Sequence, residues 1–257
     1  NDRIGDALRA KAGLKLMTHI VAGFPDLGKS AAIVETMVAA GADLIEVQLP
    51  CSDPTADGPG ITRANHRALS NGVRPEAALE MISRLTAAAK VPLLVMTYAN
   101  IPFRMGWGRF ADRAAAAGAS GAIIPDLPLE TSDGRAALAE LSRRSLSLVP
   151  VLSPGMSDGR LGDIARRASG FLYLTLRVGT TGAIGPTDPD GLAFIRRVRT
   201  VTGRPLAAGF GIASPEQVGR LRGLADIAVV GSHLIRVYET AGLPGLKEFL
   251  AKCREAC

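Results

Sequence analysis

Short apolar runs alternate with longer amphipathic segments along the whole chain. The apolar runs are continuous rather than alternating, which is typical of parallel strands covered on both faces. They predict strands at residues 16–22, 43–49, 92–97, 121–125, 147–151, 171–175, 205–209 and 226–230. Helical periodicity between them predicts helices at 28–40, 60–70, 75–89, 107–117, 131–144, 157–168, 188–201, 214–223, 231–238 and 243–255, with another near 2–12 before the first strand.

A recurring phrase marks the passage from helix to strand, as in A-A-G-A-D-L-I-E-V and A-A-G-A-S-G-A-I-I, where a glycine follows the helix as its expected carboxyl cap. Eight strands alternating with helices over 257 residues predict a (β/α)8 TIM barrel, with an extra amino-terminal helix and short extra helices in the loops. A doubly wound open sheet is the alternative, but the even spacing favours the barrel. Because no linker or shift in composition divides the chain, we expect one domain over residues 1–257.

Composition narrows the class of protein. An apolar fraction of 47% and a charged fraction of 21% fit a globular protein with a sizeable core. The net charge of +6 is scattered in arginine pairs on predicted helices, and with 4% aromatic residues nucleic-acid binding has little support. No apolar run has the length of a membrane span, the amino end does not resemble a signal peptide, and three cysteines without a framework suggest a reducing compartment. We therefore expect a cytoplasmic protein.

The stretch from Leu44 to Gly60, L-I-E-V-Q-L-P-C-S-D-P-T-A-D-G-P-G, carries carboxylates where a strand gives way to a loop. Alternation turns Glu46 and Gln48 to one face of the strand and their apolar neighbours to the other. A buried carboxylate with no compensating charge nearby is costly, so it is usually neutral or functional. Prolines stiffen the loop and hold Asp57 in place. In a barrel these residues lie at the carboxyl end of a strand, where active sites of this fold lie.

The last two predicted strands end in Gly-rich turns that run directly into helices, G-F-G-I-A-S-P-E at 209–216 and V-V-G-S at 229–232. Barrels often bind phosphate with these two loops, through backbone N–H groups at the start of a short helix. Gly182, in the loop after the sixth strand, offers a third donor. One glycine turn often only turns the chain, but two at these strands indicate a phosphate site.

The chemistry that these residues predict is acid–base catalysis. A strand carboxylate such as Glu46 in a mostly apolar pocket can exchange protons near neutral pH, while Asp57, more solvated on its loop, stays ionised and accepts a hydrogen bond from a ligand N–H. No lysine lies on a strand where a Schiff base would form, and no His pair or His-Cys-Asp cluster has metal-ligand spacing, so we expect neither a metal nor an organic cofactor. Plainer interpretations remain open. Glu46 is then a buried acid paired to an arginine, Asp57 a helix cap, and His19 and Tyr173 parts of the core.

The phrase E-V-Q-L-P-C-S-D-P-T-A-D-G-P resembles the signature of the α subunit of tryptophan synthase, where Glu is followed by P-F-S-D-P and A-D-G-P. The similarity runs the length of the chain and includes Y-A-N at 98–100, P-D-L-P at 125–128, F-L-Y-L with R-V-G-T-T-G at 171–182, G-F-G-I-A-S-P-E-Q-V at 209–218 and G-S at 231–232. The S-D-P-x-A-D-G-P element is highly specific, whereas the glycine loops taken singly are not. The resemblance implies retro-aldol cleavage of indole-3-glycerol phosphate to indole and glyceraldehyde 3-phosphate.

The resemblance also implies roles for the matching residues. Glu46 is similar to the acid–base residue that protonates the indole ring, and Asp57 to the residue that binds the indole N–H. Tyr173 resembles a substrate-contacting tyrosine, and Thr181 the loop threonine that bonds the second carboxylate when a lid closes. The other residues expected at the substrate are Tyr98, Gln48 and His19. The positions that match the phosphate site are Gly182, Gly211, Gly231 and Ser232.

Three positions depart from the family's pattern. Gln48 stands where glycine is usual and is expected to narrow or polarise the pocket. Cys51 stands in place of the usual Phe, and His19 in place of a substrate-packing Phe.

A partner is implied as well. The family's α subunit docks on a β subunit that carries pyridoxal phosphate and takes the indole through a tunnel, in an α2β2 heterotetramer. The loop 50–59 and the segment after Asn100 are expected at that interface. The alternatives are a stand-alone lyase that releases indole, a divergent homologue acting on a related phosphate, and a catalytically weak subunit that mainly activates a β subunit.

Overall fold

The computed structural model describes residues 2–176, 189–209 and 211–257, whose strands form one parallel sheet. The strands are β1 (Lys15–Val21), β2 (Leu44–Gln48), β3 (Leu93–Met96), β4 (Gly121–Ile123), β5 (Ser147–Val149), β6 (Val151–Leu152), β7 (Leu172–Thr175), β8 (Leu206–Gly209) and β9 (Ile227–Val230). They pair in the order β5-β4-β3-β2-β1-β9-β8-β7-β6. Only Pro150 separates β5 from β6. Because proline has no N–H to donate to the hydrogen bonds between strands, it interrupts the pairing there. The two strands are therefore halves of the fifth predicted strand. The sheet's two ends therefore meet, and the predicted (β/α)8 barrel is confirmed.

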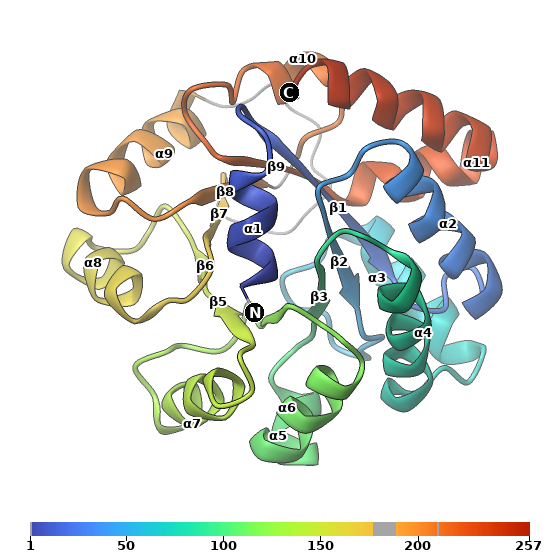
Figure 1. Cartoon of the computed structure of the whole chain (residues 1–257), viewed down its shortest axis with the longest axis horizontal. Coiled ribbons are helices and arrows are strands. Elements are labelled where there is room, and N and C mark those ends of the chain that lie inside the picture. The colour runs from blue at the N-terminus through green and yellow to red at the C-terminus, as the bar shows by residue number, and fades with distance from the viewer. Residues whose placement is uncertain (1, 177–188, 210) are drawn as a thin grey trace.

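Helices surround the barrel on its outside (Figure 1). They are α1 (Arg3–Arg9), α2 (Leu27–Ala39), α3 (Pro59–Ser70), α4 (Pro75–Ala88), α5 (Asn100–Met105), α6 (Trp107–Ala116), α7 (Ser132–Ser142), α8 (Asp158–Arg167), α9 (Pro189–Val201), α10 (Pro215–Gly219) and α11 (Ser232–Glu255). Helices α3, α4 and α10 begin with proline in their first turn, where its missing N–H costs nothing.

The short helix α1 covers the amino-terminal end of the barrel and lies across its centre in Figure 1. The Arg3 guanidinium donates to the carbonyl oxygens of Gly118 and Val91, which precede β4 and β3. Ile4 is buried among the side chains inside the barrel. The opposite end, at the carboxyl ends of the strands, is left for the loops that the sequence singles out.

Two apolar layers make the core. One fills the barrel and includes Met17, Leu44 and Phe171; the other lies between the strands and the helices. Strand β2 shows how alternation divides its residues, because Leu44 belongs to the inner layer while Ile45 and its outward neighbours belong to the outer one. The predicted inward direction of Glu46 and Gln48 is therefore confirmed.

Several boundaries differ from the sequence prediction. Helix α5 was not expected as a separate element, and α10 ends at Gly219 instead of near residue 223. The last two predicted helices form one element, but Gly242 has φ 61° and ψ −158° inside it, so two helical segments meet at a kink there. Lys15 begins β1 at its amino end, one residue before the predicted strand, and is not among the residues that line the pocket at the opposite end.

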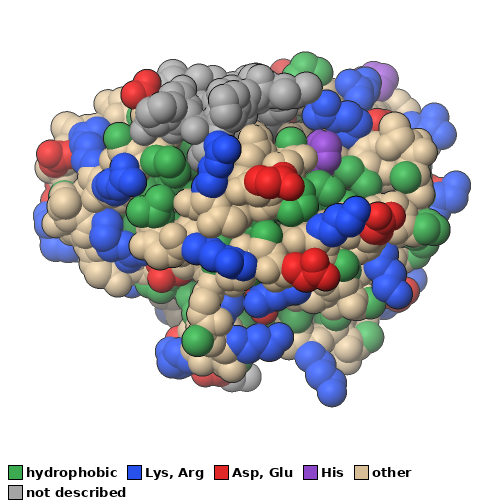
Figure 2. All heavy atoms as spheres, turned by 90° about the horizontal axis from the view of Figure 1, so that it is seen from above, with side chains coloured by type: hydrophobic (Ala, Val, Ile, Leu, Met, Phe, Trp, Pro, Cys, Tyr) green, Lys and Arg blue, Asp and Glu red, His purple; other side chains and the backbone are tan. Residues whose placement is uncertain are grey.

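The surface agrees with the interpretation of the arginine pairs as solvated helix faces. On the face shown in Figure 2, Lys and Arg side chains are interspersed with acidic ones. Arg144 pairs with Asp112 and Glu140, and Arg166 pairs with Asp163. Within the described part of the chain, no helix has the length and apolar character needed to cross a membrane.

Candidate active site

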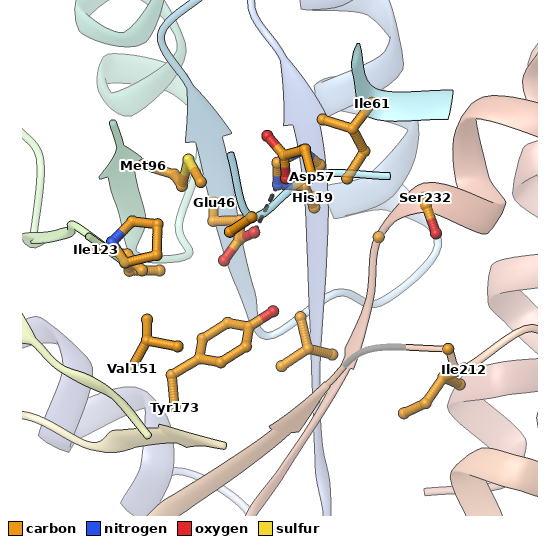
Figure 3. A pocket seen from close by; sticks show the side chains of 15 residues that line it. His19, Glu46, Asp57, Ile61, Met96, Ile123, Val151, Tyr173, Ile212 and Ser232 are labelled. Carbon is orange, nitrogen blue, oxygen red and sulfur yellow. Dashed lines mark hydrogen bonds and ion pairs between the residues drawn. The ribbon is translucent and has the colours of Figure 1, made fainter. Parts of the chain in front are cut away.

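A pocket opens at the carboxyl ends of the strands (Figure 3), with about 580 Å³ of empty space between its lining atoms, part of it open to solvent. Its walls combine polar groups with apolar side chains from all round the barrel. The lining residues are His19, Glu46, Ala56, Asp57, Ile61, Met96, Ile123, Pro125, Val151, Tyr173, Gly211, Ile212, Val229, Gly231 and Ser232. Most of the predicted site residues that the structure describes thus come together.

Glu46 and His19 form an ion pair in this pocket. They are direct neighbours in the parallel register of β1 and β2, and both point inward. Nδ1 of His19 lies 2.5 Å from Oε1 of Glu46, and the two residues are only 3% and 5% exposed. Nε2 of His19 and Oε2 of Glu46 have no hydrogen-bond partner among the described residues. The plainer interpretation of Glu46 as a partner of an arginine is therefore wrong, because its partner is a histidine.

The charge state of His19 follows from its neighbours. Burial by itself lowers the pKa of the imidazole, because a charged ring loses its hydration. The negative charge of Glu46 and its hydrogen bond, with smaller contributions from Asp57 and Gln48, outweigh burial and raise the pKa of His19 above its ordinary value of 6.5. The ring is therefore more readily protonated than a histidine in water.

Asp57 is held by two side chains from behind the pocket. Nε2 of Gln48 donates to its Oδ2 at 2.8 Å, and the hydroxyl of Tyr98 also hydrogen-bonds its carboxylate. Asp57 is 9% exposed and Glu46 is 5% exposed, so the loop acid is only slightly more solvated than the strand acid. Burial raises the pKa of Asp57 despite the opposing effects of the His19 charge and of these two hydrogen bonds.

Gln48 and Tyr98 are positioned differently from what the resemblance suggests. Neither lines the pocket: the amide of Gln48 turns to Asp57 and Asn65, and the Tyr98 hydroxyl accepts a hydrogen bond from the backbone N–H of Ala56 at 3.1 Å. Gln48 therefore supports the loop acid and does not narrow the pocket directly. Contact of either residue with a substrate stays a prediction.

Sequence reasoning missed Asn65, which ties α3 to the loop. Its Oδ1 accepts from the backbone N–H of Cys51 at 2.9 Å and lies 3.4 Å from Nε2 of Gln48, while its Nδ2 donates to the carbonyl oxygen of Ile61. Asn65 is 1% exposed, next to the buried Ala64 and Ala68. A polar residue on the apolar face of a predicted helix is the signal that would have found it.

Tyr173 projects from β7 toward Glu46 and His19 (Figure 3). Burial, together with the negative charges of Glu46 and Asp57, raises the pKa of its phenol. The phenol has room because β8 ends in glycine: a Cβ atom on Gly209 would lie 2.8 Å from the Tyr173 hydroxyl oxygen. Tyr173 therefore remains neutral and faces the two carboxylates across the pocket.

The predicted phosphate residues Gly211, Gly231 and Ser232 lie together at one side of the pocket. Gly231 is the N-cap of α11 and gives that helix no side-chain cap, so the start of α11 suits an anion that accepts from backbone N–H groups. Gly211 has φ 94°, in the left-handed region that favours glycine. The other two predicted residues of the ligand site, Thr181 and Gly182, lie outside the described residues.

The remaining reactive groups lie away from the pocket chemistry. Burial raises the pKa of the Cys51 thiol, and its sulfur is 3.8 Å from the side chain of Asn100. Lys15 is 2% exposed and bonds the carbonyl oxygen of Lys11, before the amino end of β1. In residues 2–176, 189–209 and 211–257, no group of three or more His, Cys, Asp or Glu side chains is arranged to hold a metal ion.

Comparisons with known proteins show the family of this chain. The sequence profile described as "Tryptophan synthase alpha chain" matches residues 6–255. The tryptophan synthase alpha chain of Desulforapulum autotrophicum is 43% identical over 242 residues, which cover 94% of this chain and 95% of that protein. The one from Syntrophotalea carbinolica is 41% identical over 247 residues, covering 95% of this chain and 96% of that protein.

Solved structures show the same fold over the same length. Tryptophan synthase from M. tuberculosis in an aminoacrylate-bound form superposes with a TM-score of 0.88 at 31% identity, over 100% of this chain and 99% of that chain. The alpha subunit from Legionella pneumophila superposes with a TM-score of 0.89 at 30% identity, over 100% of this chain and 98% of that chain. With a profile match from residue 6 to residue 255, this chain belongs to the family of tryptophan synthase alpha chains.

Proposed function

We propose that this protein cleaves indole-3-glycerol phosphate to indole and glyceraldehyde 3-phosphate, as the α subunit of tryptophan synthase. The observation that carries the proposal is the position of Glu46 and Asp57, which face one pocket from a strand and from the loop after it. Family membership supports the same reaction.

The pocket has a distinct place for each part of this substrate. The phosphate binds at the open start of α11 and at the turn containing Gly211, where backbone N–H groups and the helix dipole favour an anion. The flat indole ring packs among the apolar lining side chains, which include Met96, Ile123 and Val151. The glycerol carbons then lie between the two, toward Glu46.

In this arrangement Glu46 moves protons and Asp57 stabilises charge. Glu46 donates a proton to the ring carbon that bears the glycerol chain, and the positive charge that develops spreads to the ring nitrogen. Asp57 accepts a hydrogen bond from the ring N–H and stabilises that charge, and the interaction is strong because the carboxylate is only 9% exposed. Glu46 then takes the proton of the adjacent hydroxyl as the carbon–carbon bond breaks. The chain's own residues supply every group in this scheme, so no cofactor is assigned to it.

A β subunit is the partner in this proposal, in an α2β2 assembly that holds pyridoxal phosphate only in the β subunits. The alpha-chain naming of the relatives supports a complex. Phe103 on α5 supports a docking face near the pocket, because it is 65% exposed and α5 follows directly from the carboxyl end of β3. A cytoplasmic location belongs to the same proposal.

The test is indole release from indole-3-glycerol phosphate, measured with and without a β subunit. The wild type should release indole, and a β subunit should accelerate the release. If neither preparation releases indole while the protein remains folded, the proposed substrate is wrong. Release at one rate regardless of a β subunit points instead to a stand-alone lyase and contradicts the coupled role.

A further inference from the structure

We propose that His19 is a positioning residue for this cleavage: it fixes the carboxyl group of Glu46 and holds the proton that Glu46 passes to the substrate. The inference rests on the proposed function, because it concerns the same site and the same proton transfers. In this proposal the His19–Glu46 pair, and not Glu46 alone, acts as the acid in the first step and as the base in the second.

The barrel itself brings the two groups together. His19 and Glu46 are paired in the register of adjacent strands, and the 2.5 Å contact between Nδ1 and Oε1 is drawn in Figure 3. Both residues stand on strands in the interior of the sheet, so the barrel fixes the positions of their backbones relative to each other. A hydrogen bond between charged groups at this distance is strong, and it fixes the orientation of the carboxyl group.

His19 also provides the charge that a buried carboxylate needs. Among the described residues, it is the one basic side chain that pairs with Glu46. A carboxylate that is 5% exposed is costly unless a positive group or several donors compensate it. The pair is thus stable with the proton on the imidazole and the negative charge on Glu46.

The other groups around His19 favour the same state. Asp57 faces it from the loop after β2, and Tyr173 faces it from β7 with a phenol that stays neutral. The pocket residues that β9 and α11 contribute beside it, Val229 and Ser232, carry no charge. Two carboxylates therefore surround one imidazole, and together they outweigh the effect of burial on its protonation.

The proton balance of the reaction fits a pair. In the first step the proton moves from His19 through Glu46 to the ring carbon, which leaves a neutral imidazole and a carboxylate. In the second step the hydroxyl proton moves to Glu46 and back to His19. The O–H electron pair forms the carbonyl, the carbon–carbon bond breaks, and its electrons restore the aromatic ring. One proton enters the ring and one leaves the hydroxyl, so the pair returns to its starting state.

Two variants of His19 distinguish its two roles, which are to fix the carboxyl group of Glu46 and to hold the proton. In His19→Asn the amide can still donate to Glu46, but it carries no titratable proton. His19→Phe removes both the donor and the proton. A residue that only fills space would tolerate Phe at least as well as Asn, whereas the proposal predicts the order wild type, then Asn, then Phe.

The first measurement is a nuclear magnetic resonance titration of the histidine side chains, which does not depend on activity. The chain has three histidines, and the signal of His19 is assigned by its loss in His19→Asn. We expect the His19 ring to titrate above the ordinary 6.5 in the wild type and lower in Glu46→Gln. If His19 titrates no higher than 6.5, or if Glu46→Gln leaves its titration unchanged, the pair does not hold the proton and the proposal is overturned.

The second measurement is the pH profile of kcat for indole release, with His66→Gln as the matched control. We expect His19→Asn to lower kcat about 100-fold with little change in KM. We also expect it to shift the part of the pH profile of kcat in which the His19–Glu46 pair changes its protonation. If His19→Phe keeps the wild-type kcat and profile, the proposal falls while the proposed function stands. If the wild type releases no indole, the proposed function falls, and the titration still decides whether the pair shares a proton.

Discussion

The side-chain amide of Gln48 donates a hydrogen bond of 2.8 Å to the carboxylate of Asp57, behind the wall of the pocket. Both residues come from the strand and loop that also carry Glu46, so one stretch of chain supplies both acids and a support for the second. The position of Asp57 therefore depends on a neighbour that does not line the pocket.

Replacing that support should weaken the site. Gln48→Gly removes the hydrogen bond to Asp57 and leaves a void beside a buried carboxylate, which should lower the free energy of unfolding by about 1–3 kcal/mol. Because Asp57 is then less well placed for a ring N–H, KM for indole-3-glycerol phosphate should rise. Urea unfolding and steady-state kinetics measure the two effects. A lower KM in the variant would show that Gln48 obstructs the substrate and does not support Asp57.

The close approach of Gly209 to Tyr173 gives a second prediction. Gly209→Ala places a methyl group 2.8 Å from the Tyr173 hydroxyl oxygen, so the phenol must move from its place opposite Glu46. Activity should fall about tenfold or more, as expected when a pocket group is displaced. Gly203→Ala is the control, because its Cβ meets nothing within 4 Å. Equal activities of the two variants would show that the position of Tyr173 does not matter for the reaction.

The turn at Gly211 gives a third prediction, which concerns the phosphate. Gly211→Ala strains a backbone with φ 94° beside the open end of α11, so binding of glycerol 3-phosphate, used as a probe, should weaken. Gly223→Ala is the matched control: it imposes similar strain at φ 73°, and Gly223 is not among the residues lining the pocket. Calorimetric titration compares the two. Equal weakening in both variants would mean that strain alone, and not the site, accounts for the loss.

The His19–Glu46 pair makes stability depend on pH with a definite sign. The pKa of His19 is raised in the folded protein above the ordinary 6.5 of the unfolded chain. Between these two values the folded state binds more protons, so the free energy of unfolding falls as pH rises. The stabilisation is complete below 6.5 and is lost as pH rises through the folded pKa.

His19→Asn isolates this contribution, because it lacks the titrating ring. The difference in unfolding free energy between wild type and His19→Asn should be largest below about pH 6 and should shrink toward about pH 9. Urea unfolding at a series of pH values measures it. A difference that stays constant over that range would show that His19 does not titrate with a raised pKa.

Much of the fold and part of the site follow from the sequence. Alternation on β2 predicts that Glu46 points inward, and the position of His19 on β1 predicts the same for the imidazole. Their pairing does not follow, because the register between β1 and β2 is set by closure of the whole barrel. Helix α5 escapes prediction because it is a short segment with Pro102 inside it and the exposed Phe103.

The supporting residues of the site were harder to predict. Tyr98 lies at the end of β3, where a pocket residue is expected, yet its hydroxyl turns to Ala56 and Asp57. That direction depends on how the loop after β2 folds back over β3. Asn65 likewise acquires its role from a contact with Cys51, which is remote in sequence. Such contacts come from loops packed in three dimensions, for which a single sequence carries little signal.

The most direct test of the account is the yield of indole and glyceraldehyde 3-phosphate from indole-3-glycerol phosphate, compared between wild type and Glu46→Gln. The wild type should form both products in equal amounts. Glu46→Gln should be slower by about 10²- to 10⁴-fold, because the proton carrier is gone, while it still binds glycerol 3-phosphate. Wild-type rates in Glu46→Gln would contradict the assignment of Glu46 and with it the proposed mechanism.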